Sequence, residues 1–227
     1  MKSSRVIGKM PNADRPDPGV RRHCVISGTG RAGTSFLVQL LTHLGLDTGY
    51  TINDLTLHKH ARAGLERDVR APDAPYIVKS PWFCDYAEEV FARPDIQIDQ
   101  ILVPMRDLFA AAESRRFVVR NAAEALPAAE RDSLDGSTVA GGLWHTTDGT
   151  RQELVLLSQL YRLMLAASAT DASITLLRFP LLTEDPKYLF SKLEPIIGDI
   201  TFEGFRSTFD TVVKPDWVHK FGTGDST

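Results

Sequence analysis

The chain has 227 residues, 43% of them hydrophobic, which suffices for one α/β domain of ordinary size with a full core. A formal net charge of −3 argues against general nucleic-acid binding, and the two cysteines, Cys24 and Cys84, provide neither a disulfide framework nor a metal-binding spacing. No apolar run approaches the roughly twenty residues of a membrane span. We therefore expect a cytoplasmic protein without membrane or nucleic-acid partners.

Residues 1–22 are polar and dotted with proline, and they lack the apolar core of a signal peptide. We expect them to form a loose arm in front of a single domain at 23–227. Within that domain strand signals alternate with helical ones, which is typical of a parallel sheet covered by helices on both faces. The expected strands are 24–26, 76–78, 96–105 and 174–177. Helices are expected over 36–44, from Arg106 to about Ala122, over 154–165 and over 186–197.

Polar groups follow three of these strands directly. They are the segment from Gly28 to Ser35, the pair Lys79 and Ser80, and the segment from Arg106 to Ser114. Because open α/β sheets bind ligands beyond the carboxyl ends of their strands, neighbouring strands would bring these groups into one crevice.

The first of these segments has the outline of a phosphate-binding loop. Gly28 and Gly33 lie five residues apart, and Thr34 and Ser35 open the next helix. Glycines allow backbone amides to approach an anion, and the first amides of a helix have no internal partner. The position after the last glycine holds Thr34 where ATPases and kinases have lysine, and the cation stands earlier, at Arg31. A tight strand-to-helix connection without a ligand is the alternative.

The second arrangement pairs a cation with a hydroxyl. Arg106 ends a strand and Ser114 lies eight residues later, about two helical turns away on nearly the same face. Together they could bind one phosphate, the arginine in bidentate fashion. Alone, Arg106 could equally pair with a surface carboxylate and Ser114 could face solvent.

With these two motifs the chain resembles the sulfotransferases that use 3′-phosphoadenosine 5′-phosphosulfate (PAPS), especially their bacterial branch. Their loop reads Gly-x-x-Arg-Ser-Gly-Thr-Ser or Pro-Lys-Ser-Gly-Thr-Thr, and residues 31–36 match it with Ala32 where serine is usual. Their second motif is an arginine at a strand end with a serine eight positions on, although Leu108 here replaces a frequent proline. Weaker similarities cover 79–81, 174–198 and the basic, glycine-containing segment 219–225.

The resemblance implies a three-layer α/β fold of the P-loop nucleoside-triphosphate-hydrolase type, with a parallel sheet flanked by helices. It implies sulfuryl transfer from PAPS to a hydroxyl or amine of a small molecule or glycan, with no metal required. The residues that it assigns to the 5′ phosphosulfate are Gly30, Arg31, Ala32, Gly33, Thr34 and Ser35, and those that it assigns to the 3′ phosphate are Arg106 and Ser114.

Catalysis would depend mainly on positioning and electrostatics. Arg31 and then Lys79 are the candidates for stabilising charge on the bridging oxygen. Many animal members place their catalytic histidine where Pro81 stands here, so the base is sought elsewhere. His58 and His60 are candidates for it, with Glu66, Asp54 and His145 as further ones.

Two other functions remain open from the sequence. A P-loop kinase of small metabolites would need a lysine at position 34 and magnesium ligands, neither of which is evident. A protein that keeps the fold for binding or for another transfer is compatible with the missing histidine.

Overall fold

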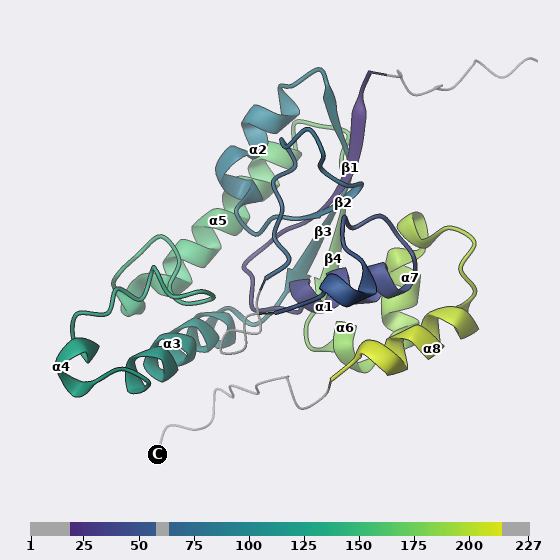
Figure 1. Ribbon diagram of the computed structural model, residues 1–227. Helices are drawn as coiled ribbons and strands as arrows, with labels where there is room; N and C mark the ends of the chain where they lie inside the picture. Colours follow the sequence, from purple (N-terminus) through teal and green to yellow (C-terminus); the bar gives the residue numbers. More distant parts are fainter. Residues whose placement is uncertain (1–18, 58–63, 215–227) are drawn as a thin grey trace, which may run out of the picture.

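The computed structural model describes residues 19–57 and 64–214. In this part of the chain, strands and helices alternate as the sequence predicts (Figure 1). The elements are β1 (Arg21–Ile26), α1 (Thr34–His43), η1 (Ile52–Asp54), β2 (Ile77–Lys79), α2 (Phe83–Phe91), β3 (Ile96–Met105), α3 (Leu108–Glu124), α4 (Ala128–Arg131), η2 (Gly149–Arg151), α5 (Gln152–Ala167), β4 (Ser173–Arg178), α6 (Leu181–Glu184), α7 (Pro186–Ile197) and α8 (Phe202–Val212).

The strands form one sheet in the order β2-β1-β3-β4, and all neighbouring strands are parallel. The connection that leaves β1 passes through α1 to β2 on one side, whereas the connection that leaves β3 leads to β4 on the other side. The carboxyl ends of β1 and β3 therefore lie at a topological switch point. Ligands of open α/β sheets bind at such points.

Helices cover both faces of the sheet and complete three layers (Figure 1). On one face, Ile26 of β1 packs with Leu37 of α1 and Phe205 of α8, and α7 lies beside them. On the other face, Val25 packs with residues of α2 and with Leu163 of α5. β1 is central and faces helices on both sides, which explains its continuous apolar run.

The sequence located the sheet and its two-sided cover, but several details differ. β1 begins at Arg21, inside the segment that we expected to be a loose arm. Helices α2, α6 and α8 were not predicted, because each is short or lies in polar sequence. The described residues contain no helix that is both long enough and apolar enough to cross a lipid bilayer.

The buried side of α5 agrees only in part with the one that the sequence pattern indicated. Leu160 and Met164 of the predicted stripe pack against the core. Leu154, Leu157, Tyr161 and Leu165 belong to the same stripe, yet each is more than half exposed. The helix instead buries a side that includes Leu163. Because α5 is apolar almost all round, its periodicity could not decide which side meets the sheet.

Candidate functional site

The glycine loop, residues 27–33, joins β1 to α1 with an unusual backbone. Gly28, Gly30, Arg31 and Gly33 all have positive φ, at +119°, +63°, +57° and +87°. Only Gly30 and Arg31 are adjacent, but a backbone of this kind can turn several amides to one side and so form a concavity for an anion. Gly30 is also required sterically, because a Cβ there would lie 2.7 Å from Nη2 of Arg115. The left-handed conformation of Arg31 is uncommon for a residue with a side chain, and such strain concentrates at functional sites.

The start of α1 continues this concavity. Gly33 is its N-cap, and no side chain caps the ten-residue helix. Its first amides and the positive end of its dipole are therefore available to an anion. Thr34 and Ser35, the first two residues of the helix, both line the adjacent cavity. Their hydroxyls add donors to the backbone amides.

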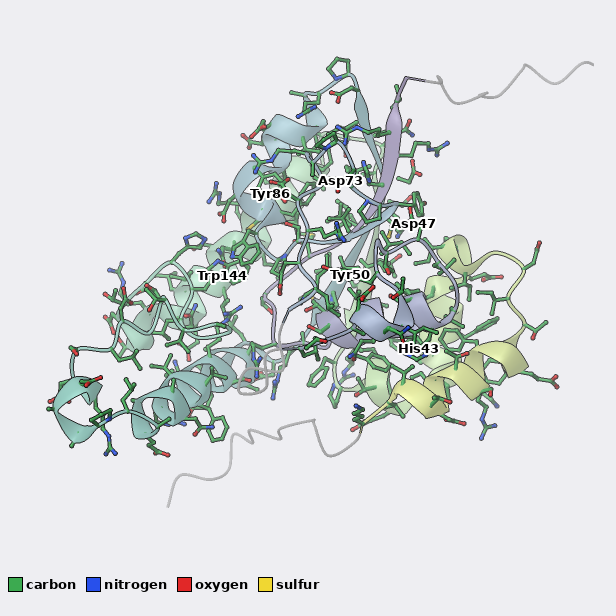
Figure 2. The ribbon with its side chains drawn as sticks, in the orientation of Figure 1. His43, Asp47, Tyr50, Asp73, Tyr86 and Trp144 are labelled. Carbon is green, nitrogen blue, oxygen red and sulfur yellow. The ribbon has the colours of Figure 1, made fainter. Side chains whose placement is uncertain are left out.

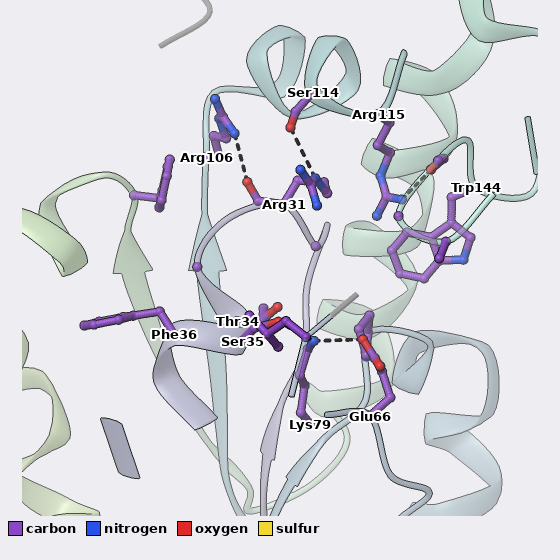
Figure 3. A pocket seen from close by; sticks show the side chains of 18 of the residues that line it. Arg31, Thr34, Ser35, Phe36, Glu66, Lys79, Arg106, Ser114, Arg115 and Trp144 are labelled. Carbon is purple, nitrogen blue, oxygen red and sulfur yellow. Dashed lines mark hydrogen bonds and ion pairs between the residues drawn. The ribbon is translucent and has the colours of Figure 1, made fainter. Parts of the chain in front are cut away.

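The second motif lies against the glycine loop from the β3 side. Arg106 directly follows β3, and its Nη1 donates a hydrogen bond to the carbonyl oxygen of Arg31 at 3.0 Å. Asp107 caps α3 by accepting from the backbone N–H of Ala110 at 2.9 Å. This start directs Ser114 inward, where it is buried and its Oγ accepts from Nε of Arg31 at 3.2 Å (Figure 3). The two motifs, 83 residues apart, are thus in direct contact.

A buried lysine lies on the opposite, β2 side of the glycine loop. Lys79 ends β2 and is only 3% exposed. Its Nζ donates to Oγ of Ser35 at 2.8 Å, to the carbonyl of Gly64 at 2.6 Å and to Oε1 of Glu66 at 2.8 Å (Figure 3). Burial lowers the pKa of Lys79, the ion pair with Glu66 opposes that shift, and the nearby Arg31 adds to it. The ammonium therefore links the glycine loop to a carboxylate.

These groups surround one cavity of about 410 Å³ at the carboxyl ends of the strands. The cationic side chains in its wall are Arg31, Lys79, Arg106, Arg115 and Lys214. Among the described residues that line it, Glu66 is the only carboxylate. Burial lowers the pKa of Arg106, and the neighbouring Asp107 opposes that shift. Such an excess of partly desolvated positive charge suits a ligand with several negative charges.

The expected loop residues meet in this cavity with one exception. Gly30, Arg31, Gly33, Thr34 and Ser35 line it, together with Lys79, Arg106 and Ser114. Ala32 is fully buried and packs into the protein instead, so only its backbone could contact a ligand.

One residue of this wall, Arg115, escaped the sequence analysis as a site residue. Arg115 follows Ser114 directly but points beneath the glycine loop, and Trp144 lies against α3 and α5 (Figures 2 and 3). No sequence signal could have revealed Arg115, because a buried and an exposed arginine give the same pattern along a helix.

The candidates for the proton acceptor are separated by their positions. His58 and His60 lie outside the described residues, as does the segment 219–225. His145 is exposed, with Nε2 2.9 Å from Oδ2 of Asp85, and it does not line the cavity. Asp54 is exposed in η1 and accepts from the hydroxyl of Thr51. Of the described candidates, only Glu66 reaches the cavity.

In residues 19–57 and 64–214, no three side chains of the His, Cys, Asp and Glu types gather in a way that could hold a metal ion. A comparison of the chain with models of known protein families finds no match. A search among curated proteins finds no match either. The functional conclusion therefore rests on the site.

Proposed function

We propose that this protein is a PAPS-dependent sulfotransferase with the P-loop-like sulfotransferase fold. The observation that carries the proposal is the contact between its two motifs at the β1/β3 switch point. Arg31 of the glycine loop bonds to Ser114, and Arg106 bonds to the backbone of Arg31. A nucleotide with one anionic group on the glycine loop and a second on Arg106 and Ser114 fits this arrangement.

The donor set supports a phosphosulfate more than a triphosphate. Thr34 occupies the position of the kinase lysine, and the cation of the loop is Arg31. The concavity of positive-φ residues and the uncapped start of α1 provide backbone donors for the 5′ group. Arg106 and Ser114 would then hold the 3′ phosphate that distinguishes this nucleotide from ATP.

Charge and proximity assign the steps of the transfer to residues of the chain. PAPS supplies a sulfuryl group attached to a phosphate leaving group. In the transfer a new bond joins sulfur to the acceptor oxygen or nitrogen, and the bond from sulfur to the bridging oxygen breaks with its electron pair going to the phosphate. Arg31 and Lys79 would stabilise that developing charge. Glu66 would take the acceptor proton, since its carboxylate lines the cavity beside Lys79.

The sheet order suggests where the acceptor binds. Arg106 follows β3 and Lys79 ends β2, so they flank the glycine loop on opposite sides. With the 3′ phosphate at Arg106, the acceptor would enter on the Lys79 side. Pro81 and Trp82 come next in the wall there, and Trp82 is 47% exposed. Because Lys79 is already paired with Glu66, this side suits an uncharged organic acceptor better than a polyanionic glycan.

The proposal is tested by ligand-induced stabilisation. The ligands are 3′-phosphoadenosine 5′-phosphate (PAP), ATP and AMP, each with and without magnesium. PAP at about 100 times its Kd should add about 2.7 kcal/mol, which raises the melting temperature of a chain of this size by roughly 5–10 °C. PAP should act without magnesium, and AMP should have a much smaller effect at equal concentration. Stabilisation by ATP with magnesium but not by PAP would replace the proposal with the kinase.

Turnover requires a separate measurement, because a protein that binds PAP could have lost catalysis. Incubation with PAP and p-nitrophenyl sulfate runs the transfer in reverse and releases coloured p-nitrophenolate. Release that depends on PAP supports an enzyme that accepts phenols. PAP binding without transfer to or from any acceptor tested would support the repurposed fold instead.

A further inference from the structure

Arg115 is a buried cation that joins two loops of the site. Its side chain is 6% exposed and lies over the ring of Trp144, with 4.7 Å from the guanidinium carbon to the ring centre. Nη2 donates to the carbonyl of Thr29 in the glycine loop at 2.7 Å. Nη1 donates to the carbonyl of Gly142 at 2.8 Å. Residues 137–144, which we call the wall loop, also line the cavity. One guanidinium thus joins the glycine loop to the wall loop, and Figure 3 shows Arg115 beside Trp144.

The charge of Arg115 is not balanced by a carboxylate within the described residues. Its Nε is buried without a hydrogen-bond partner. Burial lowers the pKa of Arg115 to about 9, with a further contribution from Arg31, so the side chain remains charged at neutral pH. A buried, unpaired charge is costly to a folded protein unless something compensates it. Arg115 lines the cavity beside the glycine loop, since a Cβ on Gly30 would lie 2.7 Å from its Nη2.

We propose that Arg115 is a positioning residue that couples anion binding on the glycine loop to the order of the wall loop. An anion in the concavity would compensate the guanidinium and strengthen its hold on the carbonyls of both loops. Coupling of this kind is reciprocal, so a well-ordered wall loop would in turn favour the bound anion. The nucleotide would therefore order the wall loop, which forms another part of the cavity lining, before the acceptor arrives. The inference rests on the proposed function only for the identity of the anion.

The wall loop contains amides that report its order. The N–H of Gly142 donates to the carbonyl of Val139 at 2.8 Å, and that of Leu143 donates to the carbonyl of Gly136 at 2.9 Å. Exchange of these amides requires the loop to open. Hydrogen exchange of peptides covering 137–144 is measured with saturating PAP, with pyrophosphate and without ligand. We expect PAP to slow the exchange about tenfold in the unmodified protein, which corresponds to about 1.4 kcal/mol.

Three variants distinguish the effect of the charge of Arg115, the effect of its bonds to both loops, and direct shielding of the wall loop by the ligand. Arg115→Met should lower PAP affinity and, at saturating PAP, lose the slowed exchange. Arg115→Lys keeps the charge but not the planar fork that reaches two carbonyls. It should bind PAP within about threefold of the unmodified affinity yet still lose most of the slowed exchange. Arg120→Met is the control, since Arg120 lies exposed on the same helix and pairs with Glu113.

The outcomes distinguish this inference from the function on which it rests. Full slowing in both Arg115 variants at saturation would overturn the coupling, because the ligand alone would then shield the loop. PAP could fail to bind while pyrophosphate still slows the exchange in the unmodified protein but not in the Arg115 variants. The nucleotide assignment would then fail and the coupling would stand. If neither anion changes exchange in the unmodified protein, the coupling is wrong. Should Arg115→Met not fold, Arg115→Lys still decides between bridging and shielding.

Discussion

Replacing Arg106 by alanine should remove the selectivity of the site for a 3′-phosphorylated nucleotide. In the structure this guanidinium lies over the ring of Phe179, 5.0 Å from its centre, and donates to the carbonyl of Arg31. Arg106 and Ser114 both line the cavity on the β3 side of the glycine loop, whereas Lys79 lies on its β2 side. The variant therefore tests which end of the cavity holds the additional phosphate.

The size of the effect depends on which bonds are lost. Hydrogen bonds to charged groups contribute about 1.5–3 kcal/mol each, so loss of a bidentate phosphate contact should cost about 3–4 kcal/mol. That corresponds to about a 10²- to 10³-fold weaker affinity for PAP. The lost bond to the Arg31 carbonyl affects every ligand of the glycine loop. It should cost about 1 kcal/mol, or roughly fivefold.

Titration calorimetry with PAP and with adenosine 5′-phosphosulfate, which lacks the 3′ phosphate, measures both quantities. Arg106→Ala should weaken PAP strongly and the second ligand only slightly. Arg120→Ala, on the exposed part of α3, should change neither affinity. Equal losses for the two ligands would refute the assignment of Arg106 to the 3′ phosphate. They would leave it a role only in supporting the glycine loop.

Other perturbations test the remaining parts of the site. Gly30→Ala places a Cβ 2.7 Å from Arg115 at a φ of +63°, and it should cost about 1–3 kcal/mol of unfolding free energy in a denaturant titration; a cost near zero would contradict the close packing behind the loop. Glu66→Gln should leave PAP affinity within a few fold and slow transfer by about 10²–10⁴-fold, whereas undiminished transfer would require another base. Trp82→Ala should raise the KM for an aromatic acceptor more than it lowers kcat, and an unchanged KM would remove Trp82 from the acceptor side.

Features that depend on neighbouring residues could be predicted from the sequence. The apolar run before Ser27, the glycines at 28, 30 and 33 and the leucines after Ser35 indicate a strand, a tight loop and a helix without reference to distant residues. The placement of Arg106 at a strand end required only the run at 96–105. The convergence of these segments followed from the general rule for parallel sheets.

Features that depend on contacts between distant segments were decided by the tertiary structure. The pairing of Lys79 with Glu66 and the contact of Arg31 with Ser114 join segments that no local pattern relates. The sequence carries no signal for the direction in which Arg115 points, since a guanidinium beneath a loop and one in solvent give the same pattern along a helix.

The sequence by itself thus determined that a glycine loop with an arginine stands at a strand end and that a second arginine and a serine follow another strand. The tertiary structure decided which strands are neighbours, so that these groups and Lys79 line one cavity as the rule for parallel sheets predicts, and that Glu66 pairs with Lys79 there. It also decided that Arg115 supports the loop from behind. The physical reason is that loop and helix starts depend on backbone conformation over a few residues. Charge pairing and burial depend on packing, which brings together residues far apart in the chain.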